Sequence, residues 1–163
     1  MRHSAFALAA VLVFAAVPAF AQSPVQIEHA KAGASCPRCN LFQADFSNVQ
    51  MKGRDFAGAR LRQADMSTAE ITHTDFAGSD LRDLNAYGAV LGGSNFAGAN
   101  LVNASLVGTY LQGANFRGAH LAGANFSGAE MDRAVGLTQS QLALACGDAA
   151  TTAPPGLHLP LCR

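Results

Sequence analysis

The four cysteines are the residues of this sequence that could most clearly take part in chemistry. Cys36 and Cys39 form a CxxC motif, and Cys146 and Cys162 enclose fifteen residues near the C-terminus. For the CxxC motif we expect a local structural disulfide. Two alternatives stay open: a thiol redox pair, which needs a lowered thiol pKa, and a metal site that would use both cysteines and His29. A bridge between Cys146 and Cys162 would pin the C-terminal tail and stabilise the fold by roughly 3 kcal/mol.

Carboxylates and histidines are the other candidates for chemistry. A spacing of twenty residues separates the acidic pairs Asp45 and Asp65, and Asp55 and Asp75. Paired carboxylates suggest acid–base work or calcium binding, but one such pair in water costs only about 1 kcal/mol, so we expect a solvated face. His73 and His120 have no evident partner, and we expect them on the surface. The sequence contains no nucleophile elbow, phosphate loop or metalloprotease motif, so we predict no catalytic, cofactor or metal residues.

A five-residue repeat must position these side chains. From Leu41 to Met131 every fifth residue is Leu, Phe, Met or Ile at eighteen of nineteen positions, and Ala86 is the exception. A small residue, usually Ala, stands two positions before each of these centres. At Leu84 and Ala86 the large and the small residue exchange places, which nearly keeps the core volume. The period fits neither a helix nor a strand, and an internal repeat this regular must be recognised before either is assigned.

A period of twenty residues lies within the period of five. Phe recurs at positions 56, 76, 96 and 116, and Leu recurs at 41, 61, 81, 101 and 121. Four pentapeptides therefore make one turn, and like residues stack on like. We predict an all-β solenoid of four to five turns with a square cross-section. The centre and the small residue point inward, and adjacent turns pair as parallel strands about 4.8 Å apart.

The A-(D/N)-(L/F)-x-x pattern, as in GANFRGAHLAGANFSG and RQADM, resembles the pentapeptide repeat family over residues 39 to about 135. The resemblance implies a right-handed quadrilateral parallel β-helix. It also implies a remote alternative function, because some members of the family imitate DNA and modulate gyrase. That role requires a cytoplasmic location and a strongly acidic rod, and this sequence departs from both.

The two ends of the chain predict secretion and capping. Residues 1–21 have the charged start, apolar stretch and A-x-A site of a secretory signal peptide, with cleavage after Ala21. Residues 22–38 would form an N-terminal cap that contains the CxxC motif, residues 39–135 the β-helix, and residues 136–163 a C-terminal cap. Thr138 to Gln141 has the spacing of a capping box. It predicts a short helix that lays Leu137, Leu142 and Leu144 over the last turn, followed by a Pro-rich tail.

Charge and compartment narrow the function. Without Arg2, the mature chain carries 10 Lys and Arg against 11 Asp and Glu. A net charge near −1 offers no electrostatic footprint for nucleic acid or for an anionic membrane. We therefore expect a periplasmic or secreted protein that does not stay inserted in the membrane after cleavage. In that oxidising compartment the cysteines are first of all disulfide candidates.

One apolar cluster interrupts the outward positions of the middle turns. The twenty-residue stack places Tyr87 against Val107 and Val90 against Tyr110 near one corner, with Val102 on a neighbouring side. Such a composition is favoured at interaction sites, although the tyrosines could instead pack locally over the irregular repeat. We predict a non-enzymatic structural or protein-interaction module of the bacterial periplasm or envelope, whose partner is an unknown protein or envelope component. An end cap could also join two copies as a homodimer.

Overall fold

The corners of the coil explain the period of five. In nearly every repeat the N–H three residues after the centre donates to the carbonyl of the centre, as from Ala59 to Phe56 at 3.0 Å. The exceptions follow Met51 and Ile71, where the corresponding N–H donates to the hydroxyl oxygen of Thr74 or Ser94 instead. The residue two after the centre has a positive φ, which is 65° at Gly58 and 59° at Gln63. Glycine adopts this region without the steric penalty that other residues incur. This preference is why Gly recurs at that position of the repeat.

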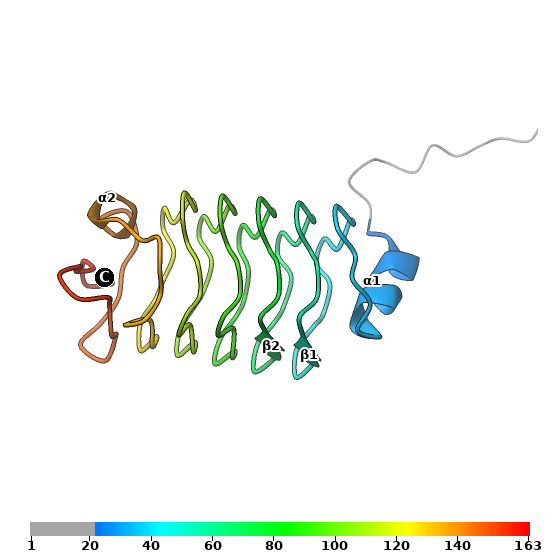
Figure 1. Ribbon diagram of the computed structural model, residues 1–163, viewed down its shortest axis with the longest axis horizontal. Helices are drawn as coiled ribbons and strands as arrows, with labels where there is room; N and C mark the ends of the chain where they lie inside the picture. The colour runs from blue at the N-terminus through cyan, green and yellow to red at the C-terminus, as the bar shows by residue number, and fades with distance from the viewer. Residues whose placement is uncertain (1–21) are drawn as a thin grey trace, which may run out of the picture.

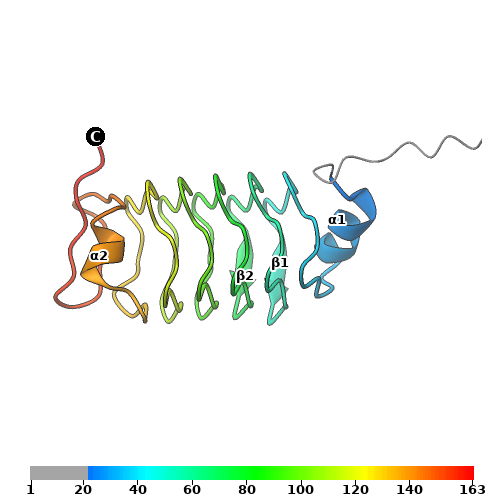
Figure 2. The same ribbon diagram turned by 90° about the horizontal axis from the view of Figure 1, so that it is seen from above.

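The protein is a rod of stacked turns with a cap at each end (Figures 1 and 2). The computed structural model describes residues 22–163, so the predicted signal peptide, residues 1–21, lies outside the described residues. Helix α1 (Pro24–Lys31) covers one end, and helix α2 (Gln139–Leu142) lies with the C-terminal tail at the other. Strands β1 (Gln50–Lys52) and β2 (Glu70–Thr72) pair in parallel.

The other turns are joined by parallel bridges, nearly all between residues twenty apart in the sequence. Asp45 bridges Asp65, Asp65 bridges Asn85, and the same step continues to Asn125. The twenty-residue register inferred from the sequence is therefore present in the structure. Each repeat adds one side, and each fourth repeat returns the chain to the same face.

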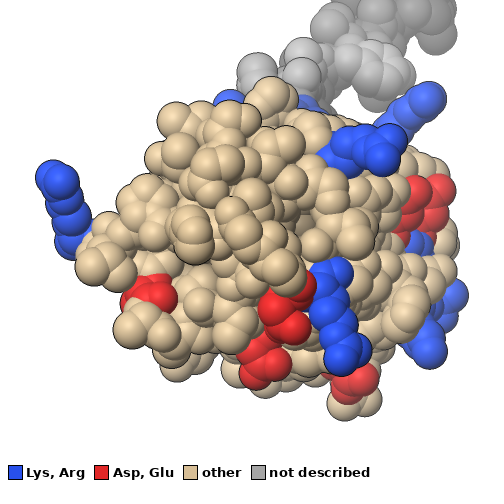
Figure 3. Space-filling model, turned by 60° about the vertical axis from the view of Figure 1, so that its left-hand side comes forward, with Lys and Arg blue, Asp and Glu red and all other residues tan. Residues whose placement is uncertain are grey.

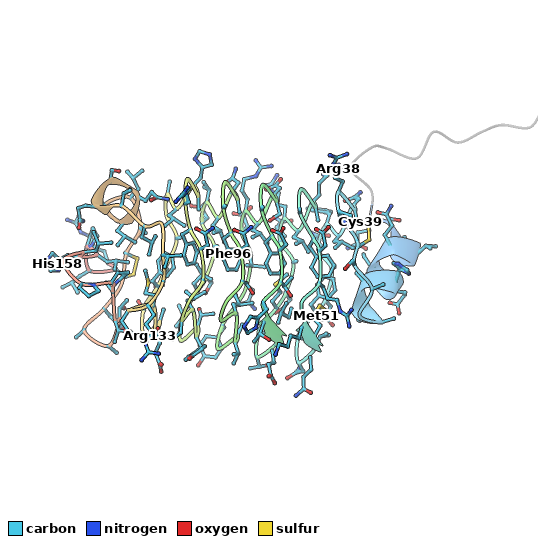
Figure 4. All side chains as sticks on the ribbon, in the orientation of Figure 1. Arg38, Cys39, Met51, Phe96, Arg133 and His158 are labelled. Atoms are coloured by element: carbon cyan, nitrogen blue, oxygen red, sulfur yellow. A yellow bond between two sulfur atoms is a disulfide. The ribbon has the colours of Figure 1, made fainter. Side chains whose placement is uncertain are left out.

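The core is a set of columns of like side chains. The rings of Phe56, Phe76, Phe96 and Phe116 follow one another at centroid distances of 5.8, 5.3 and 5.1 Å, with interplanar angles of 24°, 6° and 12°. Phe96 lies near the middle of the rod in Figure 4. Leu84 and Ala86 are both buried, so the exchanged large and small residues still fill the interior together.

The N-terminal end is closed by a helix that the sequence analysis did not predict. Within the expected cap of residues 22–38, α1 buries Ala30 against the core, and Ile27 packs beside it. The Gln26 side chain accepts a hydrogen bond from the Asn40 N–H at 2.7 Å. Arg54 occupies an inward position of the first turn but is exposed, and its guanidinium extends toward Gly33.

The C-terminal cap contains the predicted capping box, but one of its leucines points elsewhere. The Thr138 side chain accepts from the Gln141 N–H, and the Gln141 side chain accepts from the Thr138 N–H. Leu142 is buried, whereas Leu144 is 64% exposed. The expectation that Leu144 covers the last turn is therefore wrong, because the helix ends at Leu142 and the chain returns to the β-ladder. There the Gly123 N–H donates to the Leu144 carbonyl at 2.8 Å.

The Pro-rich tail is more ordered than its composition suggests. Thr152 bridges Glu130, and Leu161 bridges Gly147, both in parallel. The tail thereby adds a partial turn over the end of the rod. Within residues 22–163, no helix has the length and apolar character to span a membrane.

Candidate interaction surface

Both predicted cysteine pairs form disulfides in the structure. The Cys36–Cys39 bridge lies where the chain enters the coil, and Cys36 is buried. The backbone on both sides of Cys36 is held by the next turn, because the Cys36 N–H donates to the Asp55 carbonyl at 2.8 Å and the Arg38 N–H donates to the Ala57 carbonyl. Figure 4 shows Cys39 and Arg38 at this end of the rod.

The second bridge and the histidines do not assemble a metal centre. The Cys146–Cys162 bridge joins the tail to the last turn, at the opposite end from Cys36. His29 is exposed on α1. Among residues 22–163 no three His, Cys, Asp or Glu side chains are grouped so that they could hold a metal ion.

The carboxylates of the acidic pairs accept hydrogen bonds from backbone N–H groups. Asp55 and Asp75 each accept a hydrogen bond at 2.9 Å from the N–H two residues later. The Asn95 amide then donates to Asp75 at 3.0 Å, which starts a ladder of side chains along the face. The Asp45 pKa is lowered, chiefly by hydrogen bonds from Ser47. These carboxylates hold the backbone of the corners. Asp45 and Asp55 are exposed, and Asp65 and Asp75 are half-buried.

The four residues Tyr87, Val90, Val107 and Tyr110 lie at one corner of the rod, which we call the aromatic corner. Tyr87 is 58%, Val90 36% and Tyr110 42% exposed, and Val107 is half-buried. Val90 bridges Tyr110, and the Gly88 N–H donates to the Val107 carbonyl. The predicted stacking of these residues is thus present in the structure.

The ring of Tyr110 packs against the backbone of a glycine, Gly92. A Cβ atom built on Gly92 would lie 3.0 Å from Cε1 of Tyr110, so the ring lies directly against the Gly92 backbone. Local packing of this kind therefore exists for Tyr110, and the residue beneath its ring is Gly92. A similar contact holds His73, whose imidazole lies over Gly93. Both rings still present one side to solvent.

Acidic residues flank the aromatic corner along the rod. Glu70 bridges Val90 on one side, and Glu130 bridges Tyr110 on the other. Both carboxylates are exposed. Asp132 lies beside Glu130, and its pKa is lowered, first by the hydrogen bond from the Gln112 amide. The corner is therefore an apolar centre with a glutamate on each side along the rod. Lys52 lines a hollow with Glu70, and Arg133 lies near Asp132.

Val102, the fifth residue predicted for the patch, belongs to a different surface. It lines a groove of about 430 Å³ beside α2, which we call the α2 groove. The other lining residues are Asn100, Ala119, His120, Leu121, Ala122, Ser140, Gln141 and Leu144. None of these described residues is Asp, Glu, Lys or Arg. Figure 3, which brings the C-terminal end forward, shows a broad uncharged surface with charged residues toward its margin.

Three arginines lie on the same face as the groove, nearer the N-terminus. Arg60, Arg62 and Arg82 line a smaller hollow of about 230 Å³ with Phe42 and Asp80. Arg82 holds Asp80 through two hydrogen bonds of 2.7 Å, and this contact is the main cause of the lowered Asp80 pKa. Arg62 pairs with Asp83 at 3.2 Å. Because two of these arginines are already paired with carboxylates, the hollow is not a strongly cationic site.

Comparisons with known proteins agree with the repeat. The family model for pentapeptide repeats matches eight copies over residues 44–83, 79–118 and 99–135. No curated protein matches the sequence.

Solved structures that match the chain are pentapeptide repeat proteins. HetL, involved in heterocyst differentiation regulation in the cyanobacterium Nostoc sp. strain PCC 7120, is 22% identical over 80% of this chain and 61% of its own, with a TM-score of 0.36. A second protein from Nostoc PCC 7120 is 30% identical over 67% of this chain and 85% of its own, with a TM-score of 0.45. QnrB1, a plasmid-mediated fluoroquinolone resistance protein, is 19% identical over 75% and 78%, with a TM-score of 0.40. The chain spans about three fifths of the length of HetL. Since the family model covers more than half of the sequence, the chain belongs to the pentapeptide repeat family.

Proposed function

We propose that the protein is a secreted, non-enzymatic module of the bacterial periplasm or envelope that binds a protein partner through the aromatic corner. The coil in this proposal is right-handed, with four to five turns between its caps. The observation that carries the proposal is the exposure of Tyr87, Val90 and Tyr110 together on a rod whose outward positions are otherwise mainly polar. Large aromatic side chains at the centre of a patch are typical of binding hot spots.

Secretion is supported by two independent features. The first 21 residues have the pattern of a cleavable signal peptide, which directs a chain out of the cytoplasm. All four cysteines are bonded in the structure, one pair at each end of the rod. Disulfides persist in the periplasm and outside the cell, where the conditions are oxidising.

The flanking charges indicate what kind of partner fits. Glu70 and Glu130 lie three turns apart along one column, which corresponds to about 14 Å at the usual strand spacing. Between them lie Val90 and Tyr110. A complementary partner has an apolar centre with a Lys or Arg on each side, because charge complementarity steers association and fixes register.

The same charges disfavour a homodimer through this corner. A twofold contact brings the same patch of two copies together, so the carboxylates of Glu70 and Glu130 would face carboxylates of the other copy. The exposed parts of the two tyrosines and Val90 supply on the order of 200–300 Å², whereas a stable interface buries about 800 Å² per partner. The partner must therefore extend beyond the corner onto the adjacent polar faces.

A pull-down from the periplasm tests the proposal. Tyr87→Ser with Tyr110→Ser removes both rings, and we expect the variant to fold but to lose its partner. Leu161→Ser is the matched control, because Leu161 is an exposed apolar residue at the C-terminal end, away from the corner. Capture of the same partner by the double variant at the level of the control would refute the role of the aromatic corner.

The DNA-mimic alternative receives no support from the charge of the chain. The sequence has 11 Lys and Arg against 11 Asp and Glu, whereas a DNA mimic needs a strongly acidic surface. The similarity to QnrB1, at 19% identity, extends to the fold alone.

A further inference from the structure

One rung is missing from the hydrogen-bonded ladder on the face that carries the α2 groove. On this face each central leucine N–H donates at 2.8 Å to a carbonyl of the next turn: Leu41 to Arg60, Leu61 to Asp80, Leu81 to Asn100 and Leu101 to His120. The next donor in the column is the Leu121 N–H, and the next acceptor would be the carbonyl of Ser140. That bond is absent, and the Leu121 N–H has no acceptor anywhere in residues 22–163.

The short helix α2 causes the gap. Its capping box starts the helix at Gln139, so Ser140 is helical and does not extend along the face. The Gln141 side chain reaches back and donates to the carbonyls of Phe116 and Ala119 at 3.0 and 2.9 Å. The ladder resumes only where the Gly123 N–H meets the Leu144 carbonyl. One position of the sheet edge is thus skipped between two paired positions.

The skipped position belongs to the lining of the α2 groove. Leu121 lines the groove and is 1% exposed. Val102 and Ala122 line the groove from the coil, and Leu144 lines it from the segment that follows α2. Buried backbone N–H groups without an acceptor are rare in folded proteins, and each calls for a partner from outside the chain or for water.

We propose that the α2 groove binds a short extended peptide segment of another protein by β-strand addition. A main-chain carbonyl of the segment accepts the Leu121 N–H and completes the missing rung, and an apolar side chain packs between Val102 and Leu144. Strand addition at an open sheet edge takes its affinity from main-chain hydrogen bonds and its specificity from side-chain pockets. Since the groove lining carries no charged residue, the segment is uncharged where it enters. This site lies apart from the aromatic corner and does not depend on its role.

Leucine amides report directly on this rung. We would label the mature, fully oxidised protein with ¹⁵N-leucine and titrate it with a capped peptide of sequence SVLVS. We expect the Leu121 amide proton to move downfield and to exchange more slowly with solvent, while the amides of Leu61 and Leu81, which are already paired, stay unchanged. A capped peptide of five serines should cause no shift.

Two variants distinguish binding in the α2 groove from non-specific hydrophobic binding of the peptide. Leu144→Ser removes the exposed leucine of the groove lining and should weaken SVLVS binding about tenfold, whereas Leu161→Ser removes a similarly exposed leucine outside the groove lining and should leave binding unchanged. A Leu121 amide that does not respond to millimolar SVLVS overturns the proposal and leaves water as the partner of this N–H. A shift that depends on protein concentration without peptide, together with slower diffusion, overturns it in favour of a second copy of the chain.

Discussion

The phenylalanine column offers a quantitative test of the stacked core, through Phe96→Ala. Phe96 is 1% exposed and has a ring neighbour on each side, at 5.3 and 5.1 Å. Replacement of a buried Phe by Ala costs about 3–5 kcal/mol, and stacked ring pairs contribute about 0.5–1.5 kcal/mol each beyond their area. With two near-parallel neighbours, the loss should fall at the upper end, at about 4–5 kcal/mol.

Phe46→Ala is the matched comparison. Phe46 is equally buried, but among residues 22–163 its ring contacts only that of Phe56, at 6.2 Å and 50°. We expect a loss of about 3 kcal/mol for this variant, measured by urea unfolding of the oxidised proteins with the m-value checked for each. A lower m-value in either variant would show that the rod unfolds in parts, as repeat proteins can. If Phe96→Ala destabilises no more than Phe46→Ala at equal m-values, the stacking account is wrong.

Three further outcomes follow from particular contacts. Gly92→Ala should displace the Tyr110 ring from its contact with the Gly92 backbone. We expect a changed near-ultraviolet circular dichroism spectrum and reduced partner capture, and an unchanged spectrum would contradict this contact. The lowered Asp80 pKa gives a stabilising contribution that is present above the ordinary value of 3.8 and is lost as the pH falls through the folded-state pKa. Arg82→Gln should therefore lower the urea midpoint at pH 6, and this difference from the parent protein should shrink as the pH falls through the folded-state pKa of Asp80. A difference that stays constant with pH would contradict the pairing. Thiol titration of the unfolded mature protein should find no free cysteine. In a separate titration with a mild reductant, release of the Cys36 and Cys39 thiols before the other pair would favour the redox alternative.

The sequence was most informative where the fold repeats. A side chain such as Phe96 and its counterparts twenty residues away occupy equivalent environments, so one pattern fixes the register, the core and the outward positions of Val90 and Tyr110. The exchange of a large and a small residue at Leu84 and Ala86 could also be interpreted from the sequence, because the exchange nearly keeps the summed volume of the core.

The sequence was least informative where the repeat ends. The apolar pattern of Leu142 and Leu144 fits a helix that covers the core. In the structure, however, the Leu144 carbonyl accepts a hydrogen bond from the Gly123 N–H, and the Leu144 side chain is exposed. Helix α1 has only a weak amphipathic pattern, and tertiary contacts of Ala30 stabilise it. The seat of Tyr110 on Gly92 and the open N–H of Leu121 depend on atomic contacts across turns. No spacing rule in the sequence reports them.

Site-specific photo-crosslinking in living cells tests the central claim most directly. A benzoyl-phenylalanine at position 87 lies in the aromatic corner, and the same residue at position 63 lies on an exposed corner of the rod that carries Gln63. We predict that position 87 crosslinks to one defined envelope protein and that position 63 does not. Equal crosslinking from both positions, or none from position 87, would contradict a binding role for this surface.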